Sequence, residues 1–332
     1  MNLLNLLALP QNGAETFWFP SQASTGAARV DDLFYFIFYV SLFAFIAIVL
    51  ATIIFSLKYS RSRVGMEPED SPHHSTKIEI VWSVVPALFM VAMFWYGFKD
   101  FVDRRNPPAN SYQIDAVGQM WSWTFKYPNG ATSMGGNTDI DKGEGLVVPL
   151  GQPVVMRLES KDVLHSFFVP AFRVKQDAVP GRYSYVWFEA TEIGEFPLYC
   201  AEYCGSKHSR MLATVKVVSQ ADFDIWLASA ADISDLPPVE RGEKLFSING
   251  CIACHDVSGV NGLGPALNGK YGTQESLMDG TSVTVDDNYI RESLLDPQAK
   301  IVTGYTTPMT SFAGQLSDDD ISAIIAYIKS LN

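Results

Sequence analysis

A run of 25 residues without a charged side chain, Leu33 to Leu57, is the feature that most constrains this chain. As a helix that rises about 1.5 Å per residue, the run would be roughly 37 Å long, more than the hydrocarbon core of a bilayer, which is about 30 Å thick. A second uncharged run, Ile80 to Phe98, has 19 residues and contains Pro86, which a membrane helix tolerates with a kink. Two helices buried in a soluble core are the alternative, but such helices usually carry a polar face. We therefore expect a two-helix transmembrane hairpin.

Basic side chains predict the orientation of this hairpin. The stretch between the two runs carries Lys58, Arg61, Arg63 and Lys77, whereas only Arg29 precedes the first run. By the positive-inside rule, the connecting loop lies in the cytoplasm and both ends of the chain lie outside. The first ten residues are apolar without a basic side chain, so they are either a weak signal segment or an N-terminal tail.

The pattern changes after the second run. From Ser111, short β-branched runs alternate with clusters of Gly, Pro and Asn, which is typical of an antiparallel sandwich or barrel. Near residues 219–238 the chain becomes acidic and rich in Ala, which indicates a helix and a linker. The segments beyond are helical in pattern, and the last begins with Ser317 and Asp320 as a capping pair. We expect an N-terminal tail (1–30), the hairpin (31–105, helices about 33–57 and 79–98), an all-β domain (106–218), a helix and linker (219–238) and a helical domain (239–332).

The net charge of −12 is unevenly distributed. Residues 106–218 carry 10 basic and 11 acidic side chains, whereas residues 237–332 carry 6 basic and 12 acidic ones. No basic stretch is dense enough to indicate nucleic-acid binding. The last domain therefore presents negative charge to any soluble partner.

The first of two cysteine motifs has the residue types of a copper site. Its letters, C-A-E-Y-C-G-S-K-H-S-R-M, supply two thiols, an imidazole and a thioether, which are soft or borderline ligands. A further histidine, His165, lies about 35 residues upstream. Two cysteines with two histidines and a methionine can serve two coppers, whereas a mononuclear blue-copper site needs one cysteine. A disulfide or a zinc site remains open, and the spacing also fits one helical face, although Pro197 and Gly205 favour a loop.

The second motif, C-I-A-C-H, is the attachment signature of a c-type haem. Cys251 and Cys254 would form thioethers to the porphyrin, and His255 would be the proximal iron ligand. Zinc binding and a thioredoxin-like pair are alternatives, but neither needs a histidine directly after the second cysteine. Met309 is the candidate for the second axial ligand, since it precedes the last helix, with Met278 as the competing choice.

Residues 111–218 resemble the CuA domain of cytochrome oxidase subunit II. The motif C-x-E-x-C-x-x-x-H-x-x-M is met at every position, and D-V-L-H-S-F precedes it. The resemblance implies a cupredoxin fold with two coppers bridged by both cysteines, one histidine on each copper, and a Mg²⁺ shared with subunit I. The implied metal residues are His165, Cys200, Glu202 (by its carbonyl to copper and its carboxylate to Mg²⁺), Cys204, His208 and Met211.

Two further residues take roles from the same resemblance. Trp121, in G-Q-M-W-S-W, would be the residue through which electrons enter the copper centre, although a core aromatic is the commoner fate of a tryptophan. Glu79, in K-I-E-I-V-W-S-V-V-P, would lie at the mouth of a proton pathway of subunit I. Its alternative is a solvated carboxylate at the membrane interface, because a mid-membrane position costs about 2.5–3.5 kcal/mol.

Residues 239–332 resemble class I cytochrome c, with R-G-E-K-L-F before the haem motif and I-I-A-Y-I-K-S-L at the end. One departure is Thr310, where relatives commonly carry Pro. Together the parts resemble subunit II of a caa3-type haem–copper oxidase: a multidomain chain with a transmembrane hairpin, an all-β cupredoxin CuA domain and an all-α cytochrome c domain. The resemblance implies a two-pass protein of the bacterial inner membrane, with both metal domains on the periplasmic side.

The implied function is electron transfer within a respiratory terminal oxidase. Electrons would pass from an external donor, such as a cytochrome c or a quinol-oxidising complex, through haem c and CuA to subunit I. Oxygen reduction and proton pumping would occur there, with subunit III as a further partner. Two other functions fit the same metals: a subunit of a CuA-containing nitric oxide reductase, and a membrane-tethered copper chaperone or redox sensor.

Overall fold

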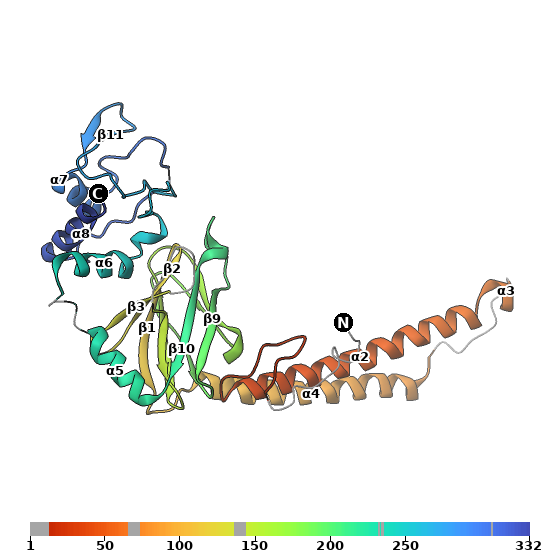
Figure 1. The fold of residues 1–332 in the computed structure, drawn as a ribbon. Helices are drawn as coiled ribbons and strands as arrows, with labels where there is room; N and C mark the ends of the chain where they lie inside the picture. The colour runs from red at the N-terminus through yellow and green to blue at the C-terminus, as the bar shows by residue number, and fades with distance from the viewer. Residues whose placement is uncertain (1–12, 66–73, 136–143, 232, 234–235, 307) are drawn as a thin grey trace. The chain divides into compact units, whose positions relative to one another are not determined.

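The computed structural model describes residues 13–332 except 66–73, 136–143, 232, 234–235 and 307 (Figure 1). Its contacts divide the chain into two compact units, residues 1–107 and 108–332. The first unit contains the two candidate membrane helices, and the second contains the β domain and the haem-motif domain. Each unit is described by itself.

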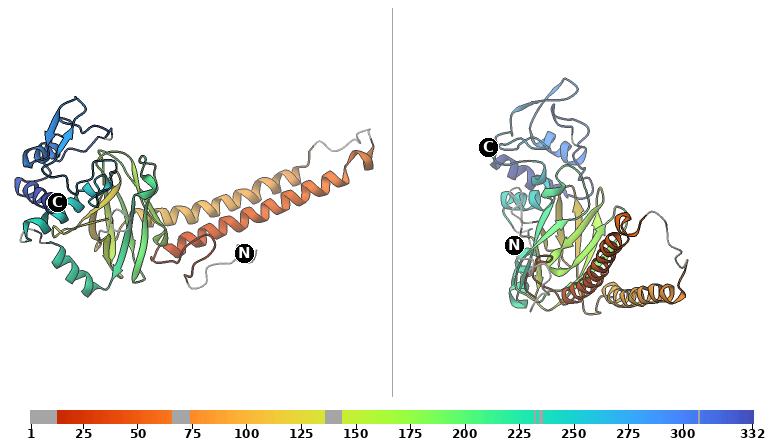
Figure 2. Two further views of the ribbon diagram at one scale, coloured as in Figure 1. Left: turned by 45° about the horizontal axis from the view of Figure 1, so that its top comes forward. Right: turned by 90° about the vertical axis from the view of Figure 1, so that its right-hand side faces the viewer.

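Two long helices, α2 (Ala27–Lys58) and α4 (Thr76–Arg105), lie side by side in the first unit, with a short helix α3 (Arg61–Val64) after α2 (Figures 1 and 2). Both helices have an apolar window long enough to cross a membrane, and no residue of either window is buried. Pro86 lies inside α4 without ending it. The apolar side chains therefore face outward, as the hydrocarbon of a bilayer requires.

Both helices extend beyond the uncharged runs because polar pairs continue them outside the apolar stretch. Arg104 pairs with Asp100 one turn earlier in α4, at 2.6 Å between Nε and Oδ2. Arg29 of α2 donates to Asp103 of α4 at 2.6 Å, and Arg104 donates to the carbonyl of Gly26 at 2.8 Å. These contacts join the start of α2 to the end of α4, which fixes the pairing of the two helices.

Two five-stranded sheets form the β domain, in the orders β3-β2-β1-β5-β8 and β4-β10-β9-β6-β7. Their inward side chains, among them Trp123, Phe125 and Phe167, are fully buried and make a sandwich core. The strands are β1 (Tyr112–Gln119), β2 (Ser122–Lys126), β3 (Thr132–Met134), β4 (Leu146–Pro149), β5 (Pro153–Ser160), β6 (His165–Val169), β7 (Val174–Ala178), β8 (Ser184–Glu189), β9 (Gly194–Cys200) and β10 (Leu212–Val218).

The prediction of a purely antiparallel arrangement is wrong at two places. Strand β1 runs parallel to β5, and β4 runs parallel to β10. Each parallel pair joins strands that are not consecutive in the chain, so other strands make the crossover. The alternation of apolar and polar residues specifies which face is buried but not the direction of the neighbouring strand.

Helix α5 (Gln220–Ala231) follows β10 and packs its aromatic side chains on the end of the sandwich. The ring of Phe223 lies 5.5 Å from that of Tyr112, and the ring of Trp226 lies 4.8 Å from that of Tyr127. The acidic segment expected to be a helix and a linker thus has a helical first half that contacts the β domain.

The described residues of the haem-motif domain form the α-helices α6 (Pro238–Ile248), α7 (Asp287–Leu295) and α8 (Asp318–Ser330) and a short hairpin of β11 (Gln274–Ser276) and β12 (Ser282–Thr284). The domain is helical as expected, and the hairpin is an addition to the expected pattern. Ser317 and Asp320 form the predicted capping box at the start of α8. The isoleucines of α8 are buried against Leu245 and Phe246 of α6, which makes the core of this domain.

Candidate metal centres

The side chains of the first cysteine motif converge where three elements meet. Cys200 is the last residue of β9, and the chain then turns through a loop and a short 3-10 helix, His208–Arg210, before β10 begins. His165 is the first residue of β6, which pairs with β9 through Phe167 and Cys200. The sulfur atoms of Cys200 and Cys204 lie 3.7 Å apart. The motif is a loop rather than a helical face, in agreement with the signals of Pro197 and Gly205.

Imidazoles and weaker donors surround this sulfur pair. Nδ1 of His165 lies 3.8 Å from Sγ of Cys200, and Nδ1 of His208 lies 3.5 Å from Sγ of Cys204. The sulfur of Met211 is 3.7 Å from Cys204, and the carbonyl oxygen of Glu202 is 3.2 Å from Cys200. The ligand atoms of His165, Cys200 and Cys204 all lie within 4.8 Å of one another, and His208 is outside that group.

The pKa values of the two thiols are split. Contact with the Cys204 thiol, aided by a hydrogen bond with His165, lowers the pKa of Cys200 to about 3. The pKa of Cys204 is raised by its hydrogen bond with Cys200, by burial and by the charge that a Cys200 thiolate places beside it. Bound cations deprotonate coordinating thiols, so a metal at this pair would remove the repulsion between two thiolates. The donor set therefore fits a cationic metal centre.

Asp162, a residue that the motifs did not indicate, orients the imidazole of His165. Its carboxylate accepts from Nε2 of the fully buried His165 at 2.8 Å and from the backbone N–H of Met120 at 2.7 Å. Burial opposes ionisation, but these hydrogen bonds hold the pKa of Asp162 below its usual value. A carboxylate on one ring nitrogen fixes the tautomer that leaves the other as the ligand. The sequence did contain a signal for this role, because an aspartate stands three residues before His165.

Trp121 lies against the loop between the two cysteines. Its indole N–H donates to the carbonyl oxygen of Cys204 at 3.1 Å. Gly205 has a φ of +115°, and a Cβ built there would stand 3.2 Å from the indole ring. A glycine is thus required both by the backbone conformation and by the close approach of Trp121.

Glu79 and the Glu202 carboxylate are the two remaining acidic predictions. Glu79 lies in the first turn of α4 and accepts from the backbone N–H of Ser75 at 3.2 Å, so it closes the start of that helix. Glu202 is half-buried, and within the described part of the chain it belongs to no close group of three metal-binding side chains. The structure gives no support to a Mg²⁺ at Glu202, which stays a prediction.

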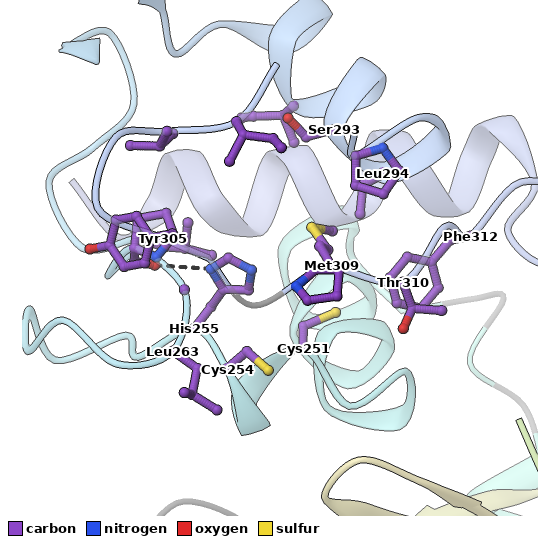
Figure 3. Close-up of a pocket in the computed structure, with 18 of the residues that line it drawn as sticks. Cys251, Cys254, His255, Leu263, Ser293, Leu294, Tyr305, Met309, Thr310 and Phe312 are labelled. Carbon is purple, nitrogen blue, oxygen red and sulfur yellow. Dashed lines mark hydrogen bonds between the residues drawn. The ribbon is translucent and has the colours of Figure 1, made fainter. Parts of the chain in front are cut away.

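A cavity of about 390 Å³ receives the side chains of the second motif (Figure 3). Cys251 and Cys254 line it from the short 3-10 helix Cys251–Ala253 and its end, with His255 directly after. Nδ1 of His255 donates to the carbonyl oxygen of Pro265 at 2.9 Å, which leaves Nε2 free as a ligand. Burial lowers the pKa of His255, so the imidazole is neutral, as iron ligation needs.

Neighbouring residues leave space for the His255 imidazole and place two methionines in the cavity wall. A Cβ at Gly264 would stand 2.6 Å from Cε1 of His255, so the chain leaves room for the imidazole at this place. Burial raises the pKa of the Cys251 thiol to about 12, so without a bound group this side chain is a neutral thiol. Both methionines line the cavity, but Met278 is 60% exposed while Met309 packs against the buried core. This packing favours Met309 as the second axial ligand.

Comparison with known proteins agrees with the division into parts. The transmembrane domain of cytochrome c oxidase subunit II matches residues 12–99, its periplasmic domain matches residues 112–218, and the cytochrome c family matches residues 239–332. Cytochrome c oxidase subunit 2 of Alkalihalophilus pseudofirmus is 31% identical over 342 residues, which cover 98% of this chain and 91% of the relative.

Other relatives carry the same name. Cytochrome c oxidase subunit 2 of Cereibacter sphaeroides is 30% identical and covers 68% of this chain and 84% of the relative. The solved periplasmic domain of subunit II of cytochrome oxidase from Bradyrhizobium japonicum is 34% identical, covers 38% of this chain and 96% of that chain, and has a TM-score of 0.35. The chain therefore belongs to the cytochrome c oxidase subunit 2 family, as a member with a cytochrome c domain fused to its C-terminal end.

Proposed function

We propose that this chain carries single electrons from an external donor, through haem c on residues 239–332 and a binuclear copper centre on residues 106–218, to subunit I of an oxidase. The observation that carries the proposal is the cluster of two cysteine sulfurs 3.7 Å apart, with an imidazole beside each. The chain is a subunit of an oxidoreductase complex, a two-pass protein of the inner membrane with its soluble domains outside.

The copper ligands are arranged in two halves. His165 lies beside Cys200 and His208 lies beside Cys204, so a centre between the sulfurs receives one imidazole from each side. The carbonyl of Glu202 lies near Cys200, and the sulfur of Met211 lies near Cys204, which gives each half one weaker donor. This two-metal arrangement accounts for His208 standing outside the group formed by His165 and the cysteines. Copper held by these residues would supply a centre that takes up and releases one electron.

The haem-motif residues would have two kinds of role, covalent attachment of the porphyrin and ligation of its iron. Cys251 and Cys254 would hold the porphyrin, and His255, through Nε2, and Met309 would hold its iron. A methionine opposite a histidine raises the reduction potential of haem iron, which suits a carrier in a respiratory chain. Met309 is half-buried in the cavity wall, against the apolar core of the domain, so it would present its thioether from an apolar side.

The partners follow from the family. Oxygen reduction and proton pumping belong to subunit I, with subunit III as a further partner, and the donor is a cytochrome c or a quinol-oxidising complex. Trp121 is the residue through which electrons enter the copper centre, supported by its hydrogen bond to the carbonyl of Cys204. Glu79 serves the mouth of a proton pathway, supported by its place in the first turn of a candidate membrane helix.

The test is Cys200→Ser in the assembled oxidase. We expect the mixed-valence electron paramagnetic resonance signal to disappear and the copper content to fall below two ions per chain. The reason is that a serine hydroxyl cannot bridge two coppers as a thiolate does. The haem spectrum of the same variant is the internal control for folding. One copper per wild-type chain, or a mononuclear spectrum, would contradict the proposal. Oxygen and nitric oxide consumption by the purified complex separates the oxidase from a nitric oxide reductase.

A further inference from the structure

Lys207, in the loop of the copper motif, contacts the haem-motif segment within the second structural unit. Nζ of Lys207 donates to the carbonyl oxygen of Ala253 at 2.6 Å. Ala253 lies between the two cysteines of the haem motif, and Lys207 directly precedes His208 in the copper loop. The same ammonium group lies 5.9 Å from the centre of the Trp121 ring.

Neutral contacts surround this lysine and bring the two domains together over a wider area. The hydroxyl of Thr124 donates to the carbonyl of Ile248, the last residue of α6, at 3.2 Å. Gly250 approaches Ser122 so closely that a Cβ built on the glycine would stand 2.9 Å from the serine hydroxyl. The haem cavity is itself completed by residues of the β domain, namely Gln119, Met120, Trp121 and Asp162.

The hydrogen bond from Lys207 has a charged donor, whereas the hydrogen bond from Thr124 has a neutral one. A hydrogen bond from an ammonium group to a carbonyl is roughly twice as strong as one between neutral groups. A second charged donor, Lys161, contacts Gln315 at 2.6 Å, but that pair is exposed to water and Gln315 belongs to the segment before α8. Lys207 is half-buried, so its hydrogen bond competes less with solvent.

We propose that Lys207 is a positioning residue for electron transfer inside this chain, holding the Cys251–Cys254 segment against Trp121 and the copper loop. The inference rests on the proposed function, because it assigns the route between the two centres. Without the ammonium group, the haem domain keeps its neutral contacts but spends less time docked. The effect is therefore on the rate of transfer between the centres and not on either centre alone.

The experiment compares Lys207→Met with Lys216→Met in the complete oxidase. Both substitutions remove one ammonium group from the β domain, but Lys216 contacts Glu195 within that domain, with 3.7 Å between the charged atoms. A soluble photoreductant reduces haem c in a flash, and the rate of electron arrival at copper is followed optically. We expect about a tenfold slower transfer in Lys207→Met, since loss of one charge-assisted hydrogen bond changes an equilibrium by roughly that factor. Lys216→Met keeps the wild-type rate.

Three further readouts separate positioning from damage. Lys207→Arg restores most of the rate, because a guanidinium group also donates to the Ala253 carbonyl, while the haem potential and the copper resonance signal stay unchanged in every variant. Wild-type transfer in Lys207→Met would overturn the inference and leave the proposed function standing. An altered copper signal in Lys207→Met would also overturn it, since the lysine would then act on the copper site. Absence of transfer in the wild type would refute the proposed function itself.

Discussion

Gly242 lies at the closest approach of α6 and α8, and its replacement by alanine tests the packing of the cytochrome domain. A Cβ built there would stand 2.0 Å from the carbonyl oxygen of Ala323, 2.6 Å from its carbonyl carbon and 2.8 Å from Cβ of Tyr327. Real Cβ atoms keep at least 3.0 Å from such neighbours, so the helices must separate by about 1 Å. Two of the three blocking atoms are backbone, so no rotamer change relieves the contact.

Two opposing terms set the size of the effect. Alanine favours a helix over glycine by about 1 kcal/mol, whereas overpacking a buried site costs about 1–3 kcal/mol. Because the obstacle is backbone, we take the upper end, and the net loss of unfolding free energy is about 2 kcal/mol. For a domain of this size, 1 kcal/mol shifts Tm by about 4–8 °C, so we expect Tm to fall by roughly 8–16 °C.

Thermal unfolding followed by the optical spectrum of the haem, in the intact chain, measures this loss. Lys244→Ala is the matched control, because Lys244 is exposed on the same helix and its replacement should stay within about 0.5 kcal/mol of the wild type. An unchanged or raised Tm in Gly242→Ala would show that the helices are free to move apart, and the packing argument would be wrong.

Two further predictions concern the haem ligand and the acid stability of the same domain. Met309→Ala should lower the haem potential and let carbon monoxide bind the ferrous iron, whereas Met278→Ala should change neither; the opposite result would make Met278 the ligand. Burial opposes ionisation of Asp320, but hydrogen bonds from Ser317 and Arg241 lower its pKa below the usual 3.8. The stabilisation that ionised Asp320 gives the folded domain is therefore complete at pH values above 3.8. It is lost as the pH falls through the lower pKa that Asp320 has in the folded state. Asp320→Asn should weaken this part of the acid unfolding seen in a pH titration, and an identical acid limb in both proteins would contradict the assignment.

Local signals made the helical parts of the fold predictable. The uncharged runs fall within α2 and α4, and the Ser317–Asp320 pair forms the capping box of α8. Each of these features depends on side chains within a few turns of one another, so a linear pattern contains the whole signal. Strand direction does not depend on nearby side chains alone. The parallel pairing of β1 with β5 was missed because it joins segments about 40 residues apart.

The candidate sites show the same limit. The cysteines and histidines stood out because their residue types and spacing are rare, and the fold brings the cysteines and histidines of the first motif close together. Asp162, the Pro265 carbonyl and Lys207 were not predicted as participants. Aspartate, proline and lysine are common residues, and their contacts depend on how loops fold over the sites, which the spacing of the motifs does not specify.

The two ligand imidazoles differ in the group that holds them, and this difference has a chemical consequence. His165 is held by the carboxylate of Asp162, whereas His255 is held by a neutral carbonyl, that of Pro265. Burial lowers the pKa of both rings, but the Asp162 carboxylate outweighs it and leaves the pKa of His165 raised, while that of His255 stays lowered. A carboxylate makes a ligating imidazole more basic and a better donor to its metal. The orienting groups, a carboxylate at His165 and a neutral carbonyl at His255, therefore distinguish the two candidate sites.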